Sequence, residues 1–468
     1  MNGEIQRPYA SLRLAIAAGL LAGGAALMPA AAADLGGNCC ADLEERIAEL
    51  EATTVRKGNR KVSLTLSGQV TTSVMAWSDG NDTHGSDTFV VDNVMGGGTF
   101  FQLAGSAKIN PNVSAGFQIV IALDTGSRSH QVSQVDDDGT SGTGNLPTGS
   151  RTTGGFDTDI VMTLANWYLD HNQLGRVTVG RINTSTAGIT TIDLGGAGVI
   201  ANASIGYTQR GMNLALDDNL LINSSATWAN ALGGNPVNGA SLSRANAVQY
   251  SSPTVGGFSL SGSWGENDIW DVALRYAGEF SGFRIAAGVG FIHNSSGTGD
   301  VSEDGGLNNP TGSPEPNQWK GSASILHVKS GLFLTGAYVN QDNDTADRPD
   351  TTLWYLQGGI GQNWTGLGKT VFYGEYARVN DGIICGPTGD AKTNCQPFGG
   401  GAGDVINSSK ADMWGVGVVQ HIDAAAMEVF LAYKRFSAEV TSPGGNELSG
   451  TVDYNDFDVV VGGARIRF

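Results

Sequence analysis

The end of the chain, residues 454–468, alternates between two kinds of side chain. Gly463, Arg465 and Arg467 fall on one side of this alternation, and the other side is apolar or small: Val460, Gly462, Ala464, Ile466 and Phe468. A period of two predicts a β-strand whose two faces meet different surroundings. The chain therefore ends on an aromatic residue of an apolar strand face.

The same alternation recurs along most of the chain from residue 62 onward. In residues 62–77, apolar residues such as Leu64 and Leu66 alternate with hydroxyl-bearing residues such as Thr65 and Ser67. Such a strand would turn one face toward lipid and the other toward water. Further strands are predicted at residues 99–109, 113–124, 160–170, 173–182, 244–251, 257–267, 269–278, 282–293, 318–328, 332–342, 351–364, 368–380, 409–422, 424–437 and 454–468.

The connections between these strands alternate in length. Tight turns are predicted at residues 110–112, 171–172, 278–281, 329–331, 365–367 and 423, and long polar loops at 78–98, 125–159, 183–243, 294–317, 381–408 and 438–453. Short turns at one end and long loops at the other are typical of barrels in the outer membrane. The predicted fold class is therefore all-β, a transmembrane antiparallel β-barrel of about 16 strands that leaves an aqueous channel.

Aromatic residues support the membrane assignment. We expect Phe468 to act as the C-terminal assembly signal and to lie in an aromatic girdle at the membrane interface. Tryptophans near the predicted strand ends are expected to lie in the same girdles: Trp77, Trp264, Trp319, Trp354, Trp364 and Trp414.

The N-terminus has the organisation of a secretory signal peptide. Arg7 and Arg13 precede an apolar stretch at residues 14–27, and small residues follow Pro29. We expect cleavage after Ala33, which makes residues 1–33 a signal peptide. A transmembrane anchor is the alternative, but the apolar stretch is shorter than the roughly 20 residues that a spanning helix needs.

Residues 34–60 differ from the barrel region, residues 61–468. Leu43, Ile47 and Leu50 recur at helical spacing, which predicts a short N-terminal periplasmic helix. This apolar stripe would either join subunits as a coiled coil or lie on the periplasmic rim of the barrel. A basic linker follows at residues 56–61.

The charge balance excludes one class of partner. Removal of residues 1–33 would leave 25 basic and 44 acidic residues, a net charge of −19. We therefore expect no nucleic-acid partner, because phosphate binding needs a basic face. Net acidity favours a modest cation preference, although selectivity depends on the few charges at the narrowest point.

Two stretches give the chain a family resemblance. The segment NCCADLEERIAELEATTVRKGNRKVSLTLSGQV near the N-terminus and the segment GRVTVGRINTSTAGITTIDLGGAGVIANASIGY resemble corresponding segments of alphaproteobacterial outer-membrane porins. The resemblance implies a 16-stranded general diffusion porin in the Gram-negative outer membrane, assembled as a homotrimer. It also implies that the third loop, at about residues 183–243, folds inward and narrows the lumen.

The resemblance and the strand alternation together suggest charges for that constriction. Asp193 is the candidate loop carboxylate, and Asp217 and Asp218 are weaker candidates. The wall candidates are Arg176, Arg275, Arg284, Glu428 and Lys434, which alternate with apolar neighbours. The alternative for each is an ordinary lumen or rim charge with no role at the narrowest point.

Four cysteines and the acidic loops suggest little further chemistry. Cys385 and Cys395 bracket a Gly/Pro-rich loop and would pair as a disulfide in an oxidising compartment, whereas Cys39 and Cys40 are adjacent. Asp136, Asp137 and Asp138 would hold a divalent cation or form a solvated loop tip. We expect no metal site, no cofactor and no enzymatic activity, because the six histidines are scattered outside any nucleophile motif.

The predicted function is a passive, water-filled channel for small hydrophilic solutes and ions. Its expected partners are further copies of itself, outer-membrane lipid and lipopolysaccharide, and those solutes. A substrate-specific channel for sugars or dicarboxylates is the first alternative, and Trp228 keeps the sugar version open. A secreted β-rich adhesin without a pore is the second.

Overall fold

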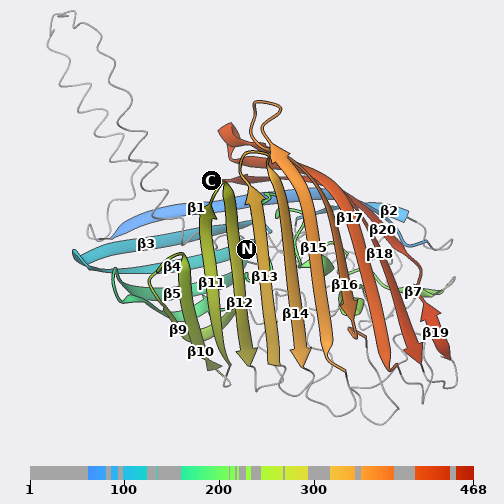
Figure 1. The fold of residues 1–468 in the computed structure, drawn as a ribbon, viewed down its shortest axis with the longest axis horizontal. Coiled ribbons are helices and arrows are strands. Elements are labelled where there is room, and N and C mark those ends of the chain that lie inside the picture. Colours follow the sequence, from blue (N-terminus) through green and yellow to red (C-terminus); the bar gives the residue numbers. More distant parts are fainter. Residues whose placement is uncertain are drawn as a thin grey trace, which may run out of the picture.

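The computed structural model describes residues 62–80, 86–92, 98–123, 134, 160–209, 211–216, 219–220, 228–232, 244–266, 269–293, 317–342, 349–383, 406–442 and 449–468. Within these ranges most strands form one antiparallel sheet that closes on itself into a barrel (Figure 1), and two short strands form a separate pair. The predicted signal peptide, the stripe of Leu43, Ile47 and Leu50, and all four cysteines lie outside the described residues.

The wall consists of long strands joined mostly to their sequence neighbours. They are β1 (Ser63–Ser78), β2 (Ser86–Val91), β3 (Phe100–Asn110), β4 (Val113–Leu123), β5 (Ile160–His171), β6 (Gly175–Asn183), β9 (Arg244–Ser251), β10 (Phe258–Gly265), β11 (Trp270–Phe280), β12 (Phe283–His293), β13 (Asn317–His327), β14 (Leu332–Asp342), β15 (Thr351–Gln362), β16 (Thr370–Asn380), β17 (Ser408–Ile422), β18 (Met427–Ser442), β19 (Gly450–Asp453) and β20 (Phe457–Arg467). A short helical turn, η6 (Asp423–Ala425), joins β17 to β18.

Two positions in the wall are each filled by a broken strand. β3 pairs with the N-terminal part of β1 and β2 with its C-terminal part. In the same way, β20 pairs with the N-terminal part of β18 and β19 with its C-terminal part. Counting each broken strand once gives a closed barrel of 16 strands, as the sequence predicts. The predictions of uninterrupted loops at residues 78–98 and 438–453 are wrong, because β2 and β19 lie within them.

The barrel closes where the first strand meets the last. β1 and β20 pair from Gln69 opposite Arg467 to Ser78 opposite Asp458. Phe468 extends this seam, since its backbone exchanges hydrogen bonds of 2.9 and 3.1 Å with Gly68. A Cβ atom at Gly68 would lie 2.5 Å from the carbonyl oxygen of Phe100, so a larger residue there would force the seam apart.

The two faces of each strand differ as predicted. Leu66 and Val70 on the outer face of β1 are 60% and 51% exposed, whereas Gln69 and Thr71 on its inner face are buried. In β20, Arg465 lies inside and is buried, and Ile466 lies outside and is exposed. Within the described residues, no helix has the length and apolar character needed to cross a membrane.

Aromatic side chains ring the outer face toward the loop ends of β10–β18. They include Trp264, Trp270, Phe291, Trp319, Tyr338, Trp354, Tyr376, Trp414 and Tyr433. Neighbours in this ring touch, with ring centroids 4.7 Å apart for Phe291 and Trp319. Toward the turn ends, Trp364 and Phe372 form a similar contact at 5.7 Å.

One predicted girdle residue is placed wrongly. Trp77 is buried on the inner face of β1, where it stacks against Phe89 and Phe457 at 6.2 and 6.1 Å. The prediction used its closeness to a strand end, whereas the period of two places it on the same face as Met75.

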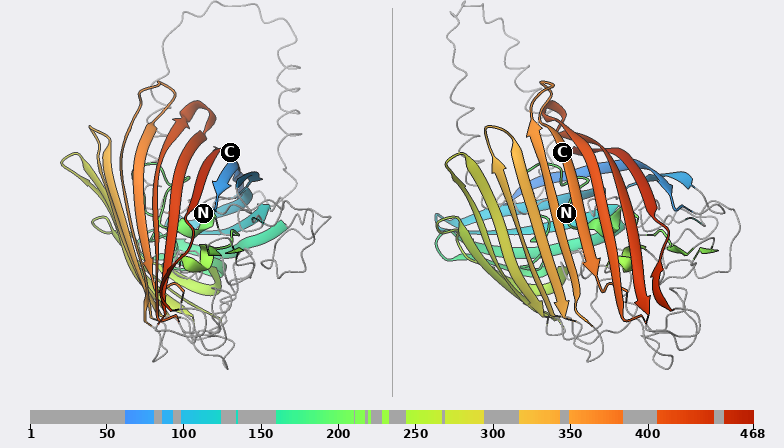
Figure 2. Two further views of the ribbon diagram at one scale, coloured as in Figure 1. Left: turned by 90° about the vertical axis from the view of Figure 1, so that its right-hand side faces the viewer. Right: turned by 45° about the vertical axis from the view of Figure 1, so that its right-hand side comes forward.

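The apolar core lies inside the barrel. Residues of the segment that follows β6 pack against the inner faces of β14–β20 and of β1. This segment contains η2 (Ile205–Tyr207), β7 (Ala215–Leu216), β8 (Asn219–Leu220) and α3 (Trp228–Ala231). Figure 2 shows it as the green trace enclosed by the wall. Part of the interior is therefore filled by protein rather than by water.

Charge on the outer face should destabilise the barrel. Val289 lies near the middle of β12, points outward and is 48% exposed. We expect Val289→Arg to lower the free energy of unfolding by about 2–4 kcal/mol, because arginine is costly at the centre of a bilayer. Urea unfolding from lipid vesicles measures this change. Val289→Leu is the control for packing, and an equal loss in both variants would contradict a lipid-facing position.

Candidate functional site

The segment between β6 and β9 is anchored to the inner wall at many points. Its polar contacts reach eight places on the wall: β9, β10, β11, β13, β15, the turn before β16, β17 and β18. The described residues 184–209 have no long regular element, so their backbone groups need side-chain partners. The wall supplies many of these partners.

Asp271 of β11 holds the beginning of this segment. Its carboxylate accepts hydrogen bonds from the backbone N–H and the hydroxyl of Thr186, at 2.6 and 2.9 Å, and from the hydroxyl of Ser263. Four residues further along β11, the guanidinium of Arg275 donates to the carbonyl oxygen of Ala187 at 2.8 Å. The predicted wall residue Arg275 therefore contacts the inward segment directly.

Small wall residues let the middle of the segment lie close to β12 and β13. A Cβ atom at Gly288 would lie 3.1 Å from Ile192, and one at Gly290 would lie 2.8 Å from Ile189. Ser322 donates to the carbonyl oxygen of Ile189, and Ser324 accepts the backbone N–H of Leu194 at 3.0 Å. These strands thus offer hydroxyl groups and space where the segment needs them.

Asp193 organises a turn in the first part of the segment. Its carboxylate accepts the backbone N–H groups of the residues that follow, at 2.6–3.0 Å: Gly195, Gly196, Ala197 and Gly198. Burial raises the pKa of the Asp193 carboxyl, and these N–H donors oppose that shift. The carboxylate is therefore used within its own turn, which we call the Asp193 turn (residues 193–198).

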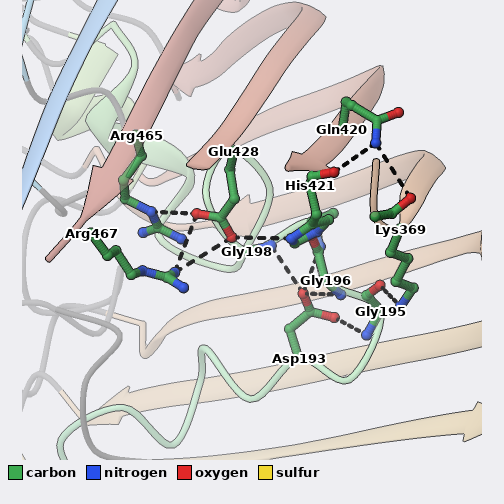
Figure 3. A network of polar contacts seen from close by, with 12 residues as sticks. Asp193, Gly195, Gly196, Gly198, Lys369, Gln420, His421, Glu428, Arg465 and Arg467 are labelled. Carbon is green, nitrogen blue, oxygen red and sulfur yellow. Dashed lines mark hydrogen bonds and ion pairs between the residues drawn. The ribbon is translucent and has the colours of Figure 1, made fainter. Parts of the chain in front are cut away.

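Two wall residues hold the carbonyl groups of the Asp193 turn (Figure 3). Lys369, in the turn before β16, donates to the carbonyl oxygen of Gly195. His421 of β17 places Nε2 2.9 Å from the carbonyl oxygen of Gly196. Burial lowers the pKa of Lys369, and the nearby Asp193 opposes that change. Gly195 itself packs against the ring of Phe333, where a Cβ atom would lie only 2.3 Å away.

A cluster of charges lies beside His421. Glu428 of β18 forms ion pairs with Arg465 at 2.6 Å and with Arg467 at 3.3 Å. Its Oε1 atom lies 3.6 Å from Nδ1 of His421. The predicted lumen residue Glu428 therefore connects β20 to the Asp193 turn through His421 (Figure 3).

A second ion pair is fully buried behind the segment. Lys434 of β18 lies 2.9 Å from Glu375 of β16, and neither side chain is exposed to solvent. The ammonium also donates to the carbonyl oxygen of Ile200 at 2.9 Å, and Tyr355 donates to Glu375 at 2.8 Å. Lys434 thus joins two wall strands to the inward segment.

The remaining candidates lie elsewhere. Arg176 pairs with Asp170 at 2.9 Å, next to the turn that follows β5. Arg284 pairs with Glu279 at 2.8 Å, with about half of each side chain exposed, at the turn between β11 and β12. Asp217 and Asp218 lie outside the described residues. The structure thus gathers Arg275, Glu428 and Lys434 along the segment of Asp193, and leaves Arg176 and Arg284 at the turn end.

Sequence reasoning did not select Asp271, Lys369 and His421, which contact the segment directly. It also did not select Glu375 and Arg465, which act through Lys434 and Glu428. Alternation placed Arg465 on the polar face of its strand, but its partner Glu428 is 37 residues away. Within the described part of the chain, no group of His, Cys, Asp and Glu side chains gathers in a way that would hold a metal ion.

Comparison with known proteins agrees with this architecture. The family model of Gram-negative porins matches residues 17–441. Among solved structures, an anion-selective porin from Comamonas acidovorans matches with a TM-score of 0.51 and 16% identity, over 87% of this chain and 100% of that one. OmpF of Salmonella typhi in complex with daunomycin has a TM-score of 0.46 and 14% identity, over 87% and 98% of the two chains. No curated protein matches the chain in sequence.

The chain therefore belongs to the family of Gram-negative porins. It is a channel of the outer membrane that admits small hydrophilic solutes by passive diffusion. This confirms the function and location predicted from the strand pattern.

The buried pair of Lys434 and Glu375 gives a stability test. Lys434→Met should lower the free energy of unfolding by about 3–5 kcal/mol, because it leaves Glu375 as an unpaired buried charge. The double variant Lys434→Met/Glu375→Gln should recover most of this loss. Urea unfolding in lipid vesicles compares the three proteins, and a double variant as unstable as the single one would contradict a coupled pair.

Proposed function

We propose that this porin is a homotrimeric general diffusion channel of the alphaproteobacterial type, in which residues 183–243 set the narrowest part of the lumen. One observation supports a constriction at this segment: its described part is anchored to the inner wall from β9 to β18. A segment fixed along one side of a barrel reduces the cross-section open to solutes.

The distribution of aromatic residues on the outer face supports a subunit interface at β1 and β3–β6. Trp and Tyr side chains mark where a protein meets the membrane interface, and here they ring β10–β18. Among the described outward positions at the loop ends of β1 and β3–β6, none is Trp or Tyr. Half-exposed aliphatic residues cover this outer face, with Val74 and Met162 toward the loop ends and Leu64 and Leu66 toward the turn end of β1. Trp167 of β5 is exposed only toward the turn end. An apolar face whose loop ends carry no Trp or Tyr suits contact with another copy of the chain.

Further features of the proposal rest on the sequence. The Leu43, Ile47 and Leu50 stripe would add a helical contact between subunits, and Cys385 and Cys395 would pair in an external loop. The lipid-facing strands β10–β18 would contact outer-membrane lipid, with lipopolysaccharide at the level of the loops. A substrate-specific channel is the competing proposal, and saturable block by one sugar or dicarboxylate would favour it.

Single-channel recording in a planar bilayer tests the function and the constriction together. The wild-type protein should give large ohmic steps in groups of three. Asp193→Ala should change the conductance and add current fluctuations, because four backbone N–H groups lose their acceptor. Asp193→Asn keeps one acceptor oxygen and should be intermediate. Silence from folded wild-type protein would contradict an open channel, and unchanged currents in Asp193→Ala would contradict a constriction at this segment.

Substitutions on opposite outer faces test the interface. Leu66→Arg on β1 should release monomers in detergent, because an unpaired charge in an apolar interface opposes association. Leu356→Arg on β15 is the matched control, since Leu356 is also exposed but lies on one of the strands that carry the aromatic ring, β10–β18. Analytical ultracentrifugation of both variants measures the assembly state. Trimers in both cases would place the interface elsewhere.

A further inference from the structure

His421 occupies an unusual position between the wall and the inward segment. Its Nε2 atom faces the carbonyl oxygen of Gly196 at 2.9 Å, and its Nδ1 atom faces Oε1 of Glu428 at 3.6 Å. Both ring nitrogens thus face oxygen atoms, and both oxygens are hydrogen-bond acceptors. Figure 3 shows the imidazole between these two groups.

The protonation state of the ring decides how well this arrangement holds. An imidazolium carries a proton on each nitrogen and can donate to both oxygens. A neutral imidazole carries one proton, so either tautomer leaves a nitrogen lone pair facing an oxygen. Only the charged form attracts the segment and the carboxylate at the same time.

The other charged groups around the ring do not remove this dependence. Glu428 is held by Arg465 and Arg467, which keep it ionised and in place. On the opposite side, Lys369 donates to Gly195, and the carboxylate of Asp193 accepts four N–H groups of its own turn. The carboxylate of Asp423 and the backbone carbonyl oxygen of His421 both lie next to Gly368, in the turn before β16. Glu428 is therefore the carboxylate that faces the ring nitrogen.

The backbone of His421 is fixed independently of its ring. Its N–H donates to the carbonyl oxygen of Lys369 at 2.8 Å, and it pairs with Glu428 across β17 and β18. A change in ring charge therefore acts on the contact with the Asp193 turn, because the strand itself is held by the sheet.

We propose that His421 is a positioning residue for the constriction, and that its protonation tightens the hold of the wall on the Asp193 turn. This inference rests on the proposed function, in which that segment limits the lumen. At pH values where the imidazole is charged, the turn is held by Lys369 and by His421 together. At higher pH the hold of His421 weakens and the turn moves more often.

Single-channel recording between pH 5.5 and 8 tests this inference. The frequency of transitions to partial conductance levels should rise about five- to tenfold across this range in the wild type, because the charge-assisted hydrogen bond from His421 to Gly196 becomes an ordinary one. His421→Gln can still donate to Gly196 but cannot be protonated, so its transition frequency should not change with pH. His421→Ala should show frequent transitions at every pH.

His327→Gln is the matched control. His327 contacts Ser330 in a turn and no residue of the inward segment in the described structure, so this variant should keep the wild-type pH profile. A His421→Gln profile equal to that of the wild type would overturn the inference. This outcome is distinct from failure of the proposed function, which would appear as closed channels or as unchanged currents in Asp193→Ala.

Discussion

The whole architecture depends on the hydrogen bonds between the first strand and the last. In a bilayer, water cannot satisfy an exposed strand edge, so a membrane-spanning sheet must close. Here β1 and β20 pair over ten positions, and the backbone of Phe468 adds a final pair of bonds to Gly68. The missing side chain at Gly68 makes room for this approach. The alternating patterns of the first and the last strand therefore form one seam together.

Closure also determines where polar groups can lie. Each strand must turn alternate residues inward, so the wall presents a dense array of hydroxyl, amide and charged groups to the interior. The inward segment uses this array, since Asp271, Ser324 and Lys434 each satisfy backbone groups that have no regular secondary structure. The same wall that spans the membrane therefore also folds the segment that occupies its lumen.

The sequence predicts the barrel well because the period of two is imposed by the membrane. It fails at β2 and β19, which are short and whose exposed positions are mostly polar, such as Ser86, Thr88, Thr451 and Asp453. Trp77 shows a different failure, because closeness to a strand end does not decide which face a residue occupies. The contacts of the candidate site are harder to predict from the sequence than the strands are. Glu428 and Lys434 were selected by alternation, but their partners Arg465 and Glu375 depend on strand pairing across many residues.

Strand pairing also changes how the acidity of the chain should be understood. The net charge of −18 would favour cations if the acidic groups lined the lumen. Along the described wall, however, carboxylates lie next to bases: Asp170 beside Arg176, Glu279 beside Arg284, Glu375 beside Lys434 and Glu428 beside Arg465. Such pairs present little net field to a passing ion, and charges more than about 8–10 Å away are screened at physiological ionic strength. Total charge therefore says little about selectivity in this channel, which depends on the few groups that remain accessible beside the inward segment.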